Sequence, residues 1–297
     1  MECCRPNPPC LYFCRLDGRL IKGQGVIANP ETGWEYEVLE TLAIGGMSTS
    51  YLVYSYYHKK LAVLKEINAE LAQKAKAREM FQREARILSS LQHSGIPQYY
   101  DFFYTSERYS LIMELIHGQN LGHIKNYTIL QIMDWMIDLC DILGYLQALQ
   151  PSVIHRDIKP SNLILRYNPR QIVLIDFGAV KEATTPPGTR IATPGFGAPE
   201  QSVGNPCIQS DFYALGATLI YFITRQLPSH FYDLNQKKFV GLEAVGIPRP
   251  LVDIIASLTE FYPENRPQNA IAAKELLQQA KSLLGEKTLQ SITSNNP

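Results

Sequence analysis

The sequence predicts an α+β fold in two lobes, a small β-rich lobe followed by a larger helical lobe, with a short Cys-rich extension ahead of them. Apolar and polar residues alternate from residue 36 to 64, whereas beyond residue 117 apolar residues recur at helical spacing. The first 33 residues are rich in Cys, Pro and Gly and show no sustained apolar period. We therefore place the extension at residues 1–33, the first lobe at 34–115, the second lobe at 116–285 and a flexible tail at 286–297.

The first lobe is predicted to be a sheet with one helix. The stretches YEVLETLAIGGMSTSYLVY and KKLAVLK alternate around a Gly-Gly turn and predict successive antiparallel strands. Between residues 73 and 91, Phe81, Leu88 and Leu91 recur at helical spacing among charged residues, which predicts an amphipathic helix packed on that sheet. A strand-like segment at 109–115 closes the lobe.

The second lobe begins with a long buried helix that ends before Pro151. Its apolar positions are Ile132, Trp135, Met136, Leu139, Ile142, Leu143 and Leu146. Further helices are predicted at 210–225, 250–259 and 268–284. Two short apolar runs, 152–154 and 172–175, flank a polar segment that holds most of the residues suited to chemistry.

Composition excludes several classes of partner. The 28 basic residues offset the 28 acidic ones, so no whole-chain charge would drive binding to nucleic acid or to an anionic membrane. No apolar run reaches eighteen residues, and the first fourteen residues lack the order of a secretory signal. We expect a cytoplasmic protein with no nucleic-acid partner and no membrane span, and the sequence carries no indication of its oligomeric state.

The segment HRDIKPSN brings Asp157, Lys159 and Asn162 within six residues of one another, on an expected loop. Phosphoryl transfer requires a carboxylate that orients the attacking hydroxyl, a cation near the phosphate and an oxygen ligand for magnesium, and these three residues supply them. The alternative is an ordinary capped polar loop. Asp176, in Asp-Phe-Gly, follows the apolar run IVLI, and an Asp at the end of a buried strand suits magnesium.

With these motifs, residues 36–284 resemble the protein kinase family, and in particular its eukaryotic-like bacterial Ser/Thr members. The resemblance implies a bilobal protein kinase fold, ATP and Mg²⁺ as cofactors, and protein substrates that carry Ser or Thr hydroxyls. It implies that Asp157 and Lys159 are catalytic and that Asn162 and Asp176 bind the metal. Signalling in bacteria is the role that follows from it.

The resemblance also implies a nucleotide site. Lys65 in AVLK matches the family's strand lysine, and Glu84 in FQREA matches its helix partner, although alone such a pair would more often be two solvated surface charges. Met113 resembles the residue beside the adenine. Glu114 and Ile116 resemble the segment whose backbone binds the adenine, which would otherwise be an ordinary strand.

Three further residues resemble the family's structural residues. Glu200, in Ala-Pro-Glu, matches the end of the activation segment, and Arg266 matches its ion-pair partner. Asp211, at a helix start, could be only an N-cap, but the matching residue in the family holds the backbone of the HRD motif.

Lys159 and Thr193 resemble the Ser/Thr class rather than the Tyr class. Arg156, beside Asp157, resembles that of kinases whose activation loop is ordered by phosphate. The candidate phosphorylation sites, which could equally be unmodified surface threonines, are Thr184, Thr185 and Thr189.

The glycine-rich loop departs from the family pattern G-x-G-x-x-G-x-V. Ala43, Gly45 and Ser48 stand at the three glycine positions, Gly46 follows the second, and Ser50 replaces the valine. Glycine matters there because its missing Cβ lets backbone N–H groups approach phosphate. We expect weaker nucleotide affinity or slower turnover, and an inactive nucleotide-binding scaffold, a pseudokinase, is the alternative function.

The extension holds Cys3, Cys4, Cys10 and Cys14, and its FCRLDG segment resembles the zinc-ribbon-like four-cysteine leader of some bacterial Ser/Thr kinases, with Asp17 in place of the last cysteine. Zinc needs about four ligands, which Cys4, Cys10 and Cys14 with Cys3 or Asp17 could provide. A metal-free relic and a redox-sensing thiol cluster are the other interpretations. A metal- or redox-dependent sensor is accordingly a further alternative for the main role.

Overall fold

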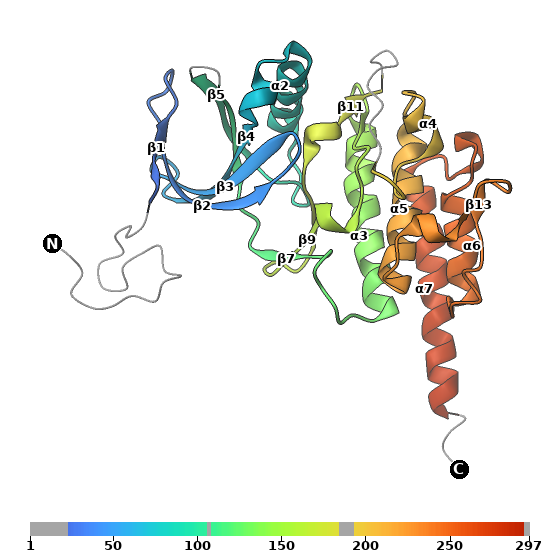
Figure 1. The fold of residues 1–297 in the computed structure, drawn as a ribbon. Coiled ribbons are helices and arrows are strands. Elements are labelled where there is room, and N and C mark those ends of the chain that lie inside the picture. Colours follow the sequence, from blue (N-terminus) through green and yellow to red (C-terminus); the bar gives the residue numbers. More distant parts are fainter. Residues whose placement is uncertain (1–22, 106–107, 184–192, 294–297) are drawn as a thin grey trace. The chain divides into compact units, whose positions relative to one another are not determined.

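The computed structural model describes residues 23–105, 108–183 and 193–293, with side chains up to residue 285. The chain divides into two compact units (Figure 1). The first comprises residues up to Gln92 together with Pro97–Leu115, and the second comprises His93–Ile96 together with the chain from Ile116 onward.

The first unit is built on a six-stranded antiparallel sheet in the order β1-β2-β3-β4-β6-β5. Its strands are β1 (Gly25–Ala28), β2 (Glu35–Ile44), β3 (Ser48–Ser55), β4 (Lys60–Ile67), β5 (Tyr99–Thr105) and β6 (Arg108–Glu114). The alternation read from the sequence becomes the inward and outward faces of these strands. The inward side chains form a core of Tyr36, Val53, Ala62, Leu64, Phe103 and Ile112.

Two helices accompany the sheet, α1 (Ala69–Ala72) and α2 (Ala75–Ser90). The predicted amphipathic helix is α2, and it packs against β5 and β6. Phe81 and Leu88 of α2 are buried, as their spacing predicts.

Strand β1 lies within the stretch that the sequence analysis assigned to the extension. It pairs with β2 from Gly25 opposite Val38 to Ala28 opposite Glu35. The turn after it is fixed by Asn29, whose Nδ2 donates to both carboxylate oxygens of Asp101, at 3.0 and 2.9 Å. A four-residue strand is too short for its alternation to be recognised, and the turn after it is held by a carboxylate 72 residues away.

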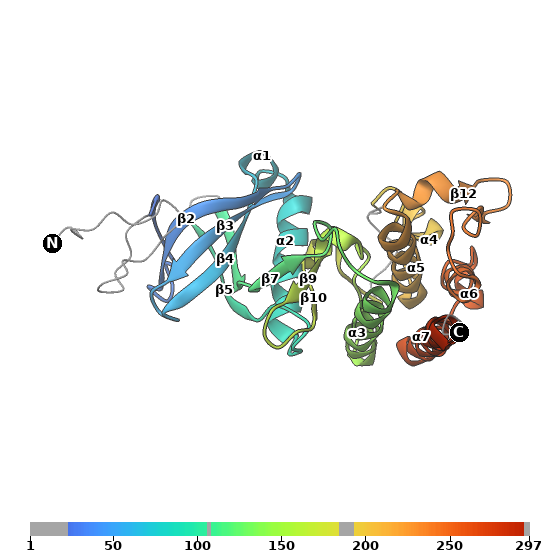
Figure 2. The same ribbon diagram turned by 90° about the horizontal axis from the view of Figure 1, so that it is seen from below.

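The second unit is mainly helical. Its helices are α3 (Ile129–Ala148), α4 (Pro199–Ser202), α5 (Ile208–Thr224), α6 (Arg249–Leu258) and α7 (Ala270–Thr293). Helix α3 begins at Thr128, which forms a capping box with Gln131. It lies beside α7 in Figure 2. Helix α5 is apolar and buried on almost every side, which places it at the centre of this unit.

Short strands complete the second unit. A three-stranded sheet is formed by β10 (Ile172–Leu174), β9 (Leu163–Arg166) and β7 (Gly118–Asn120). Two further pairs are β8 (Val153–Ile154) with β11 (Lys181–Glu182), and β12 (Tyr232–Asp233) with β13 (Lys238–Phe239). Strands β8, β9 and β10 begin or end next to the polar segment, so they fix the ends of the loop that carries it.

The α+β prediction, with strands first and helices after, is confirmed. Helix α7 runs on to Thr293, into the stretch expected to be a flexible tail, where good helix formers continue its pattern. None of the helices in the described ranges is long and apolar enough to cross a membrane.

Candidate active site

The backbone of the loop after β8 is held by a carboxylate from α5. His155 N–H donates to Asp211 Oδ2 and Arg156 N–H donates to Oδ1, both at 2.8 Å. Arg156 has a φ of 68°, a left-handed conformation that non-glycine residues rarely adopt, so the two bonds hold a strained backbone. Burial raises the pKa of Asp211 to about 6, and the two N–H donors oppose that rise.

Two further contacts secure Arg156. Its Nε donates to the carbonyl oxygen of Ala179 at 2.5 Å, and its own carbonyl accepts from Gln201 Nε2 at 2.8 Å. Gln201, in α4, was not singled out from the sequence. A Gln directly after Ala-Pro-Glu gives no sequence signal of a hydrogen bond that spans 45 positions.

The carboxylate of Asp157 is the centre of a compact polar group. Lys159 Nζ lies 2.7 Å from Asp157 Oδ2, and Asn162 Nδ2 donates to the same oxygen at 2.9 Å. The hydroxyl of Thr193 donates to Asp157 Oδ1 at 2.5 Å and accepts from Lys159 Nζ at 3.1 Å. The side chains of Asp157 and Lys159 are 12% and 23% exposed, so both remain accessible at the surface of this unit.

Asn162 and Asp176 are brought together by one backbone bond, from the Ile175 N–H to the carbonyl oxygen of Asn162 at 2.9 Å. Asn162 Nδ2 donates to the carbonyl oxygen and to Oδ2 of Asp157, at 2.8 and 2.9 Å, and neither of these bonds uses Asn162 Oδ1. Asp176 has a φ of 66°, and its carboxylate accepts from Gly178 N–H at 3.4 Å. Carboxylate and amide oxygens are the ligands that magnesium prefers, so these two residues fit a site for that metal.

No group of three or more His, Cys, Asp or Glu residues suited to a metal occurs within the described ranges. A magnesium ion bound through Asn162 and Asp176 would therefore complete its coordination with phosphate oxygens and water, as this metal commonly does.

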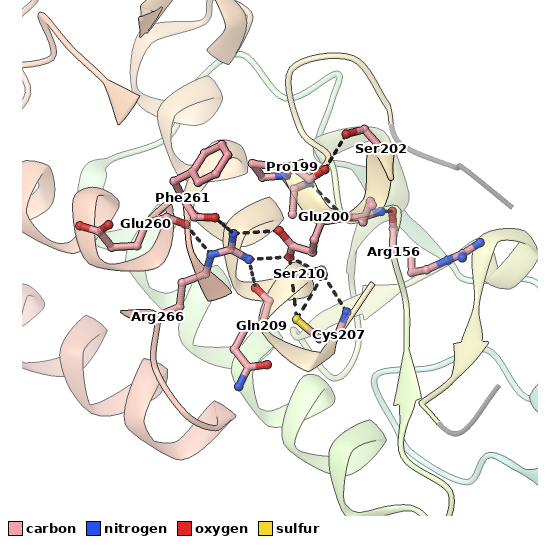
Figure 3. A network of polar contacts seen from close by, with 12 residues as sticks. Arg156, Pro199, Glu200, Ser202, Cys207, Gln209, Ser210, Glu260, Phe261 and Arg266 are labelled. Carbon is pink, nitrogen blue, oxygen red and sulfur yellow. Dashed lines mark hydrogen bonds and ion pairs between the residues drawn. The ribbon is translucent and has the colours of Figure 1, made fainter. Parts of the chain in front are cut away.

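A second network supports the segment that follows Thr193 (Figure 3). Arg266 binds the Glu200 carboxylate through both terminal nitrogens, Nη1 to Oε1 at 2.7 Å and Nη2 to Oε2 at 3.0 Å, and its side chain is fully buried. Ser210 Oγ donates to Glu200 Oε1 at 2.6 Å. The guanidinium also donates to the carbonyl oxygens of Gln209, Glu260 and Phe261. Every charge in this ion pair is thus satisfied by hydrogen bonds.

In the first unit, Lys65 and Glu84 form a buried ion pair. Lys65 Nζ lies 2.6 Å from Glu84 Oε1, and the two side chains are 11% and 3% exposed. Burial and a direct contact distinguish this pair from two solvated surface charges.

The glycine-rich segment is the hairpin between β2 and β3. Gly45 N–H donates to the carbonyl oxygen of Ser48 at 2.9 Å, and Ala43 pairs with Ser50 in the ladder. Neither Gly45 nor Gly46 has a positive φ, so the hairpin does not require glycine for its backbone conformation. Ala43, Ser48 and Ser50 all have partners in the ladder, although the register shifts between Thr41 and Ala43, so Ala and Ser are accommodated at these positions.

Asn68, just before α1, was missed by the sequence analysis. Its Nδ2 donates to the carbonyl oxygens of Gly45 and Gly46, at 2.9 and 3.2 Å, and its Oδ1 accepts from Thr49 Oγ1 at 3.0 Å. An Asn before a helical stretch could have been predicted as an N-cap. A bond to a hairpin 22 residues earlier in the chain could not.

The expected adenine segment crosses from one unit to the other. Met113 and Glu114 end β6, where they pair with Val63 and Ala62 of β4, and Ile116 begins the long segment of the second unit. The remaining candidates, Cys3, Cys4, Cys10, Cys14, Asp17, Thr184, Thr185 and Thr189, lie outside the described residues.

Comparison with known proteins gives one family. Residues 36–283 match the model of the protein kinase domain. Serine/threonine-protein kinase D of Synechocystis sp. is 33% identical over 87% of this chain and 54% of its own length. Serine/threonine-protein kinase PknA of Nostoc sp. is 32% identical over 82% of this chain and 47% of its own length. The chain thus spans about half the length of these relatives.

A solved structure gives the same fold. The crystal structure of the Mycobacterium tuberculosis PknI kinase domain superposes with a TM-score of 0.69, covering 88% of this chain and all of that domain, at 21% identity. At 21% sequence identity, this match supports the fold alone. The architecture is the bilobal fold expected from the sequence.

Proposed function

Since this chain belongs to the protein kinase domain family, we propose that it is a Ser/Thr protein kinase, which transfers the γ-phosphoryl group of Mg-ATP to Ser and Thr hydroxyls of protein substrates. The relatives named above are Ser/Thr-protein kinases, which supports the assignment of the hydroxyl class.

The observation that carries the proposal is the hydrogen bond from the Thr193 hydroxyl to the Asp157 carboxylate. Thr193 Oγ1 donates to Asp157 Oδ1 at 2.5 Å, so this carboxylate is placed to accept a hydrogen bond from an aliphatic alcohol. A substrate hydroxyl needs the same contact to be oriented for attack and to lose its proton. Lys159, 2.7 Å from the other carboxylate oxygen, is the cation that would offset the charge of the phosphoryl group.

Further residues are proposed to take part in nucleotide binding. In this proposal Lys65, oriented by Glu84, contacts phosphate oxygens, and Asn162 with Asp176 binds the metal. Bound magnesium supplies neutralisation of the charge on the phosphate oxygens. The hairpin around Gly45 covers the phosphates, and its backbone, which has no positive φ at Gly45 or Gly46, supports retained function despite the missing glycines. The pseudokinase alternative therefore has no support.

The test is transfer of labelled phosphate from Mg-ATP to a generic Ser/Thr protein substrate by the full chain. Asp157→Asn keeps the size of the side chain and removes the base, so we expect the rate to fall by at least about a hundredfold. Asp134→Asn, at an exposed carboxylate of the same unit, is the matched control and should keep full activity. Equal rates for Asp157→Asn and the wild type, or label found on tyrosine alone, would contradict the proposal.

Three finer expectations from the sequence are proposals as well. Zinc binding by Cys4, Cys10 and Cys14 with Cys3 or Asp17 is supported by the number and type of ligands. Metal analysis of the purified protein tests it, and substoichiometric zinc that a chelator does not change favours the relic or the redox cluster. Phosphorylation of Thr184, Thr185 or Thr189 is tested by a mass-spectrometric map after incubation with ATP, and the cytoplasmic location by cell fractionation.

A further inference from the structure

A basic pocket of about 520 Å³ lies on the surface of the second unit. It is lined by Gly122, His123, Ile124, Lys125, Tyr221 and Arg225. Two of these side chains are cations, one is a histidine, and none is acidic. The sequence around the pocket has the same bias, because no Asp or Glu occurs from residue 115 to 133 or from 212 to 232. The pocket is therefore a local region of positive charge on a chain whose formal net charge is zero.

Arg225 is fixed in this pocket before any ligand binds. It ends α5 with a φ of 60°, and its Nη2 donates to the carbonyl oxygens of Ile124 and Lys125 at 2.6 and 2.8 Å. Its guanidinium lies 4.0 Å from the centre of the Tyr127 ring. Within the part of the chain that the structure describes, no hydrogen bond uses Arg225 Nε or Nη1 and no ion pair involves Arg225 or Lys125. These cations thus have no protein counter-ion.

One wall of the pocket is joined to the loop that carries Asp157. Asn120 Nδ2 donates to the carbonyl oxygen of Ser161 at 2.6 Å, and Gly122 N–H donates to Asn120 Oδ1 at 2.9 Å. Gly122 lies close to Ser161: a Cβ added at Gly122 would be 3.4 Å from the Ser161 backbone. Ser161 is four residues from Asp157, so the pocket borders the loop that would receive the substrate hydroxyl.

The opposite wall is joined to the segment that carries Thr193. The ring of Tyr221 lies 6.1 Å from the ring of Phe196, three residues after Thr193. Both segments that contact the Asp157 carboxylate therefore border the pocket. An extended peptide advances about 3.3 Å per residue, so one whose hydroxyl is at Asp157 passes the pocket within a few residues.

We propose that this pocket binds an anionic side chain of the protein substrate, a carboxylate or a phosphate a few residues from the phosphorylated hydroxyl. The inference rests on the proposed function and names a feature of its substrates. The fixed guanidinium offers two free donor atoms to such an anion, and Lys125 adds a mobile cation beside it. A substrate with a basic side chain in the same place would be repelled.

The test is a set of alanine-rich peptides with one Ser, in which each flanking position carries Asp, phosphoserine or Lys in turn. At one or two positions we expect Asp to raise kcat/KM about threefold to tenfold over Ala and Lys to lower it. A larger gain with phosphoserine than with Asp would identify a phosphorylated residue as the natural anion, whereas an equal gain would identify a carboxylate.

Lys125→Glu should reverse the preference, so that Lys at the same position becomes better than Asp. Arg170→Glu is the matched control, because Arg170 is an exposed cation of the same unit that does not line the pocket, and it should keep the preference for Asp. Equal kcat/KM for Asp, Ala and Lys peptides at every position would overturn the inference, as would the same profile for Lys125→Glu and the wild type.

Binding of a fluorescent acidic peptide, followed by anisotropy, separates this inference from the proposed function. If phosphate is transferred to the neutral Ala-flanked peptide and acidic peptides are not preferred, the inference about the pocket is refuted and the proposed kinase activity stands. Acid-selective binding that Lys125→Glu abolishes, with no transfer to any peptide, refutes the kinase activity alone.

Discussion

The loop after β8 and the hairpin between β2 and β3 both have a part in the proposed phosphoryl transfer, yet they are held in place very differently. The loop is bonded to side chains that lie 36 to 56 residues further along the chain, Thr193, Gln201 and Asp211. Within the described ranges, the side chain that bonds the turn of the hairpin beyond its ladder bonds is that of Asn68.

The difference indicates which part of the reaction needs fixed geometry. Groups that orient the attacking hydroxyl lose their effect when displaced by about 1 Å, so they need many restraints from distant segments. The hairpin, which is proposed to cover the nucleotide, would have to open for nucleotide exchange, and elements that move are drawn from regions with few buried contacts. The distribution of hydrogen bonds matches this division.

The largest effect should come from breaking the Arg266–Glu200 network, which supports the segment after Thr193. Arg266→Met removes the guanidinium and leaves the Glu200 carboxylate buried with only neutral donors. Removing one partner of a buried ion pair costs about 3–5 kcal/mol, so the free energy of unfolding should fall by that amount in urea denaturation.

Arg249→Met is its control, since Arg249 forms two ion pairs with exposed partners, Glu243 and Asp253. Surface pairs contribute little, so this variant should unfold at nearly the urea concentration of the wild type. If Arg266→Met unfolds at the same urea concentration as Arg249→Met, the network does not contribute the predicted stability.

A smaller effect, on rate rather than stability, should follow at Thr193. Thr193→Val keeps the shape of the side chain and removes the hydroxyl that bridges Asp157 and Lys159. We expect kcat to fall about tenfold to a hundredfold because the carboxylate loses its orientation, while unfolding changes by about 1 kcal/mol. Steady-state kinetics measure the fall in kcat, and Thr193→Ser, which keeps the hydroxyl, should retain most of the wild-type rate. A Ser variant as slow as the Val variant would show that the methyl group, not the hydroxyl, matters.

The sequence predicts what depends on local pattern. Alternation and helical spacing indicated the sheet, α2, α3 and α5 because each buries one face or all of its surface. The triad of Asp157, Lys159 and Asn162 is local as well, and the structure brings its polar atoms within hydrogen-bonding distance.

The contacts that the sequence could not predict are made between residues far apart along the chain. Asn68 and Gln201 have ordinary neighbours, and only the folded chain places their amides against Gly45 and Arg156. The pair β12 and β13 has two residues in each strand, which is too short for a period to be recognised. Residues with long-range amide bonds are therefore the ones that a sequence analysis misses.

The hairpin gives the third prediction, on nucleotide binding. Asn68→Ala frees the carbonyls of Gly45 and Gly46, so the hairpin should sample more conformations when ATP is absent. We expect KM for ATP to rise about threefold to tenfold with kcat within about twofold, since ordering the hairpin then opposes binding. Thr49→Val, which removes only the bond from Thr49 to Asn68, should give a smaller rise. An unchanged KM would mean that the ladder alone orders the hairpin.

The fourth prediction concerns the pH dependence of stability that His155 gives to the restrained loop. Burial lowers the pKa of His155 to about 4, from 6.5 in the unfolded chain, while Asp157 and Asp176 raise it and Lys159 lowers it. Between these values the unfolded chain binds more protons, so this histidine removes stability as pH falls from about 6.5 to 4.

Asp211 acts in the opposite direction, because burial raises its pKa from 3.8 to about 6, and the folded chain therefore binds more protons between those values. The two contributions partly cancel in the wild type, so the histidine must be isolated by substitution. His155→Phe keeps a ring and removes the titration, and relative to the wild type it should gain about 2 kcal/mol of unfolding free energy between pH 7 and pH 5. Urea denaturation at both pH values measures the gain. Parallel pH profiles for the two proteins would mean that His155 is protonated as readily in the folded loop as in the unfolded chain, and that the loop is less restrained than its hydrogen bonds indicate.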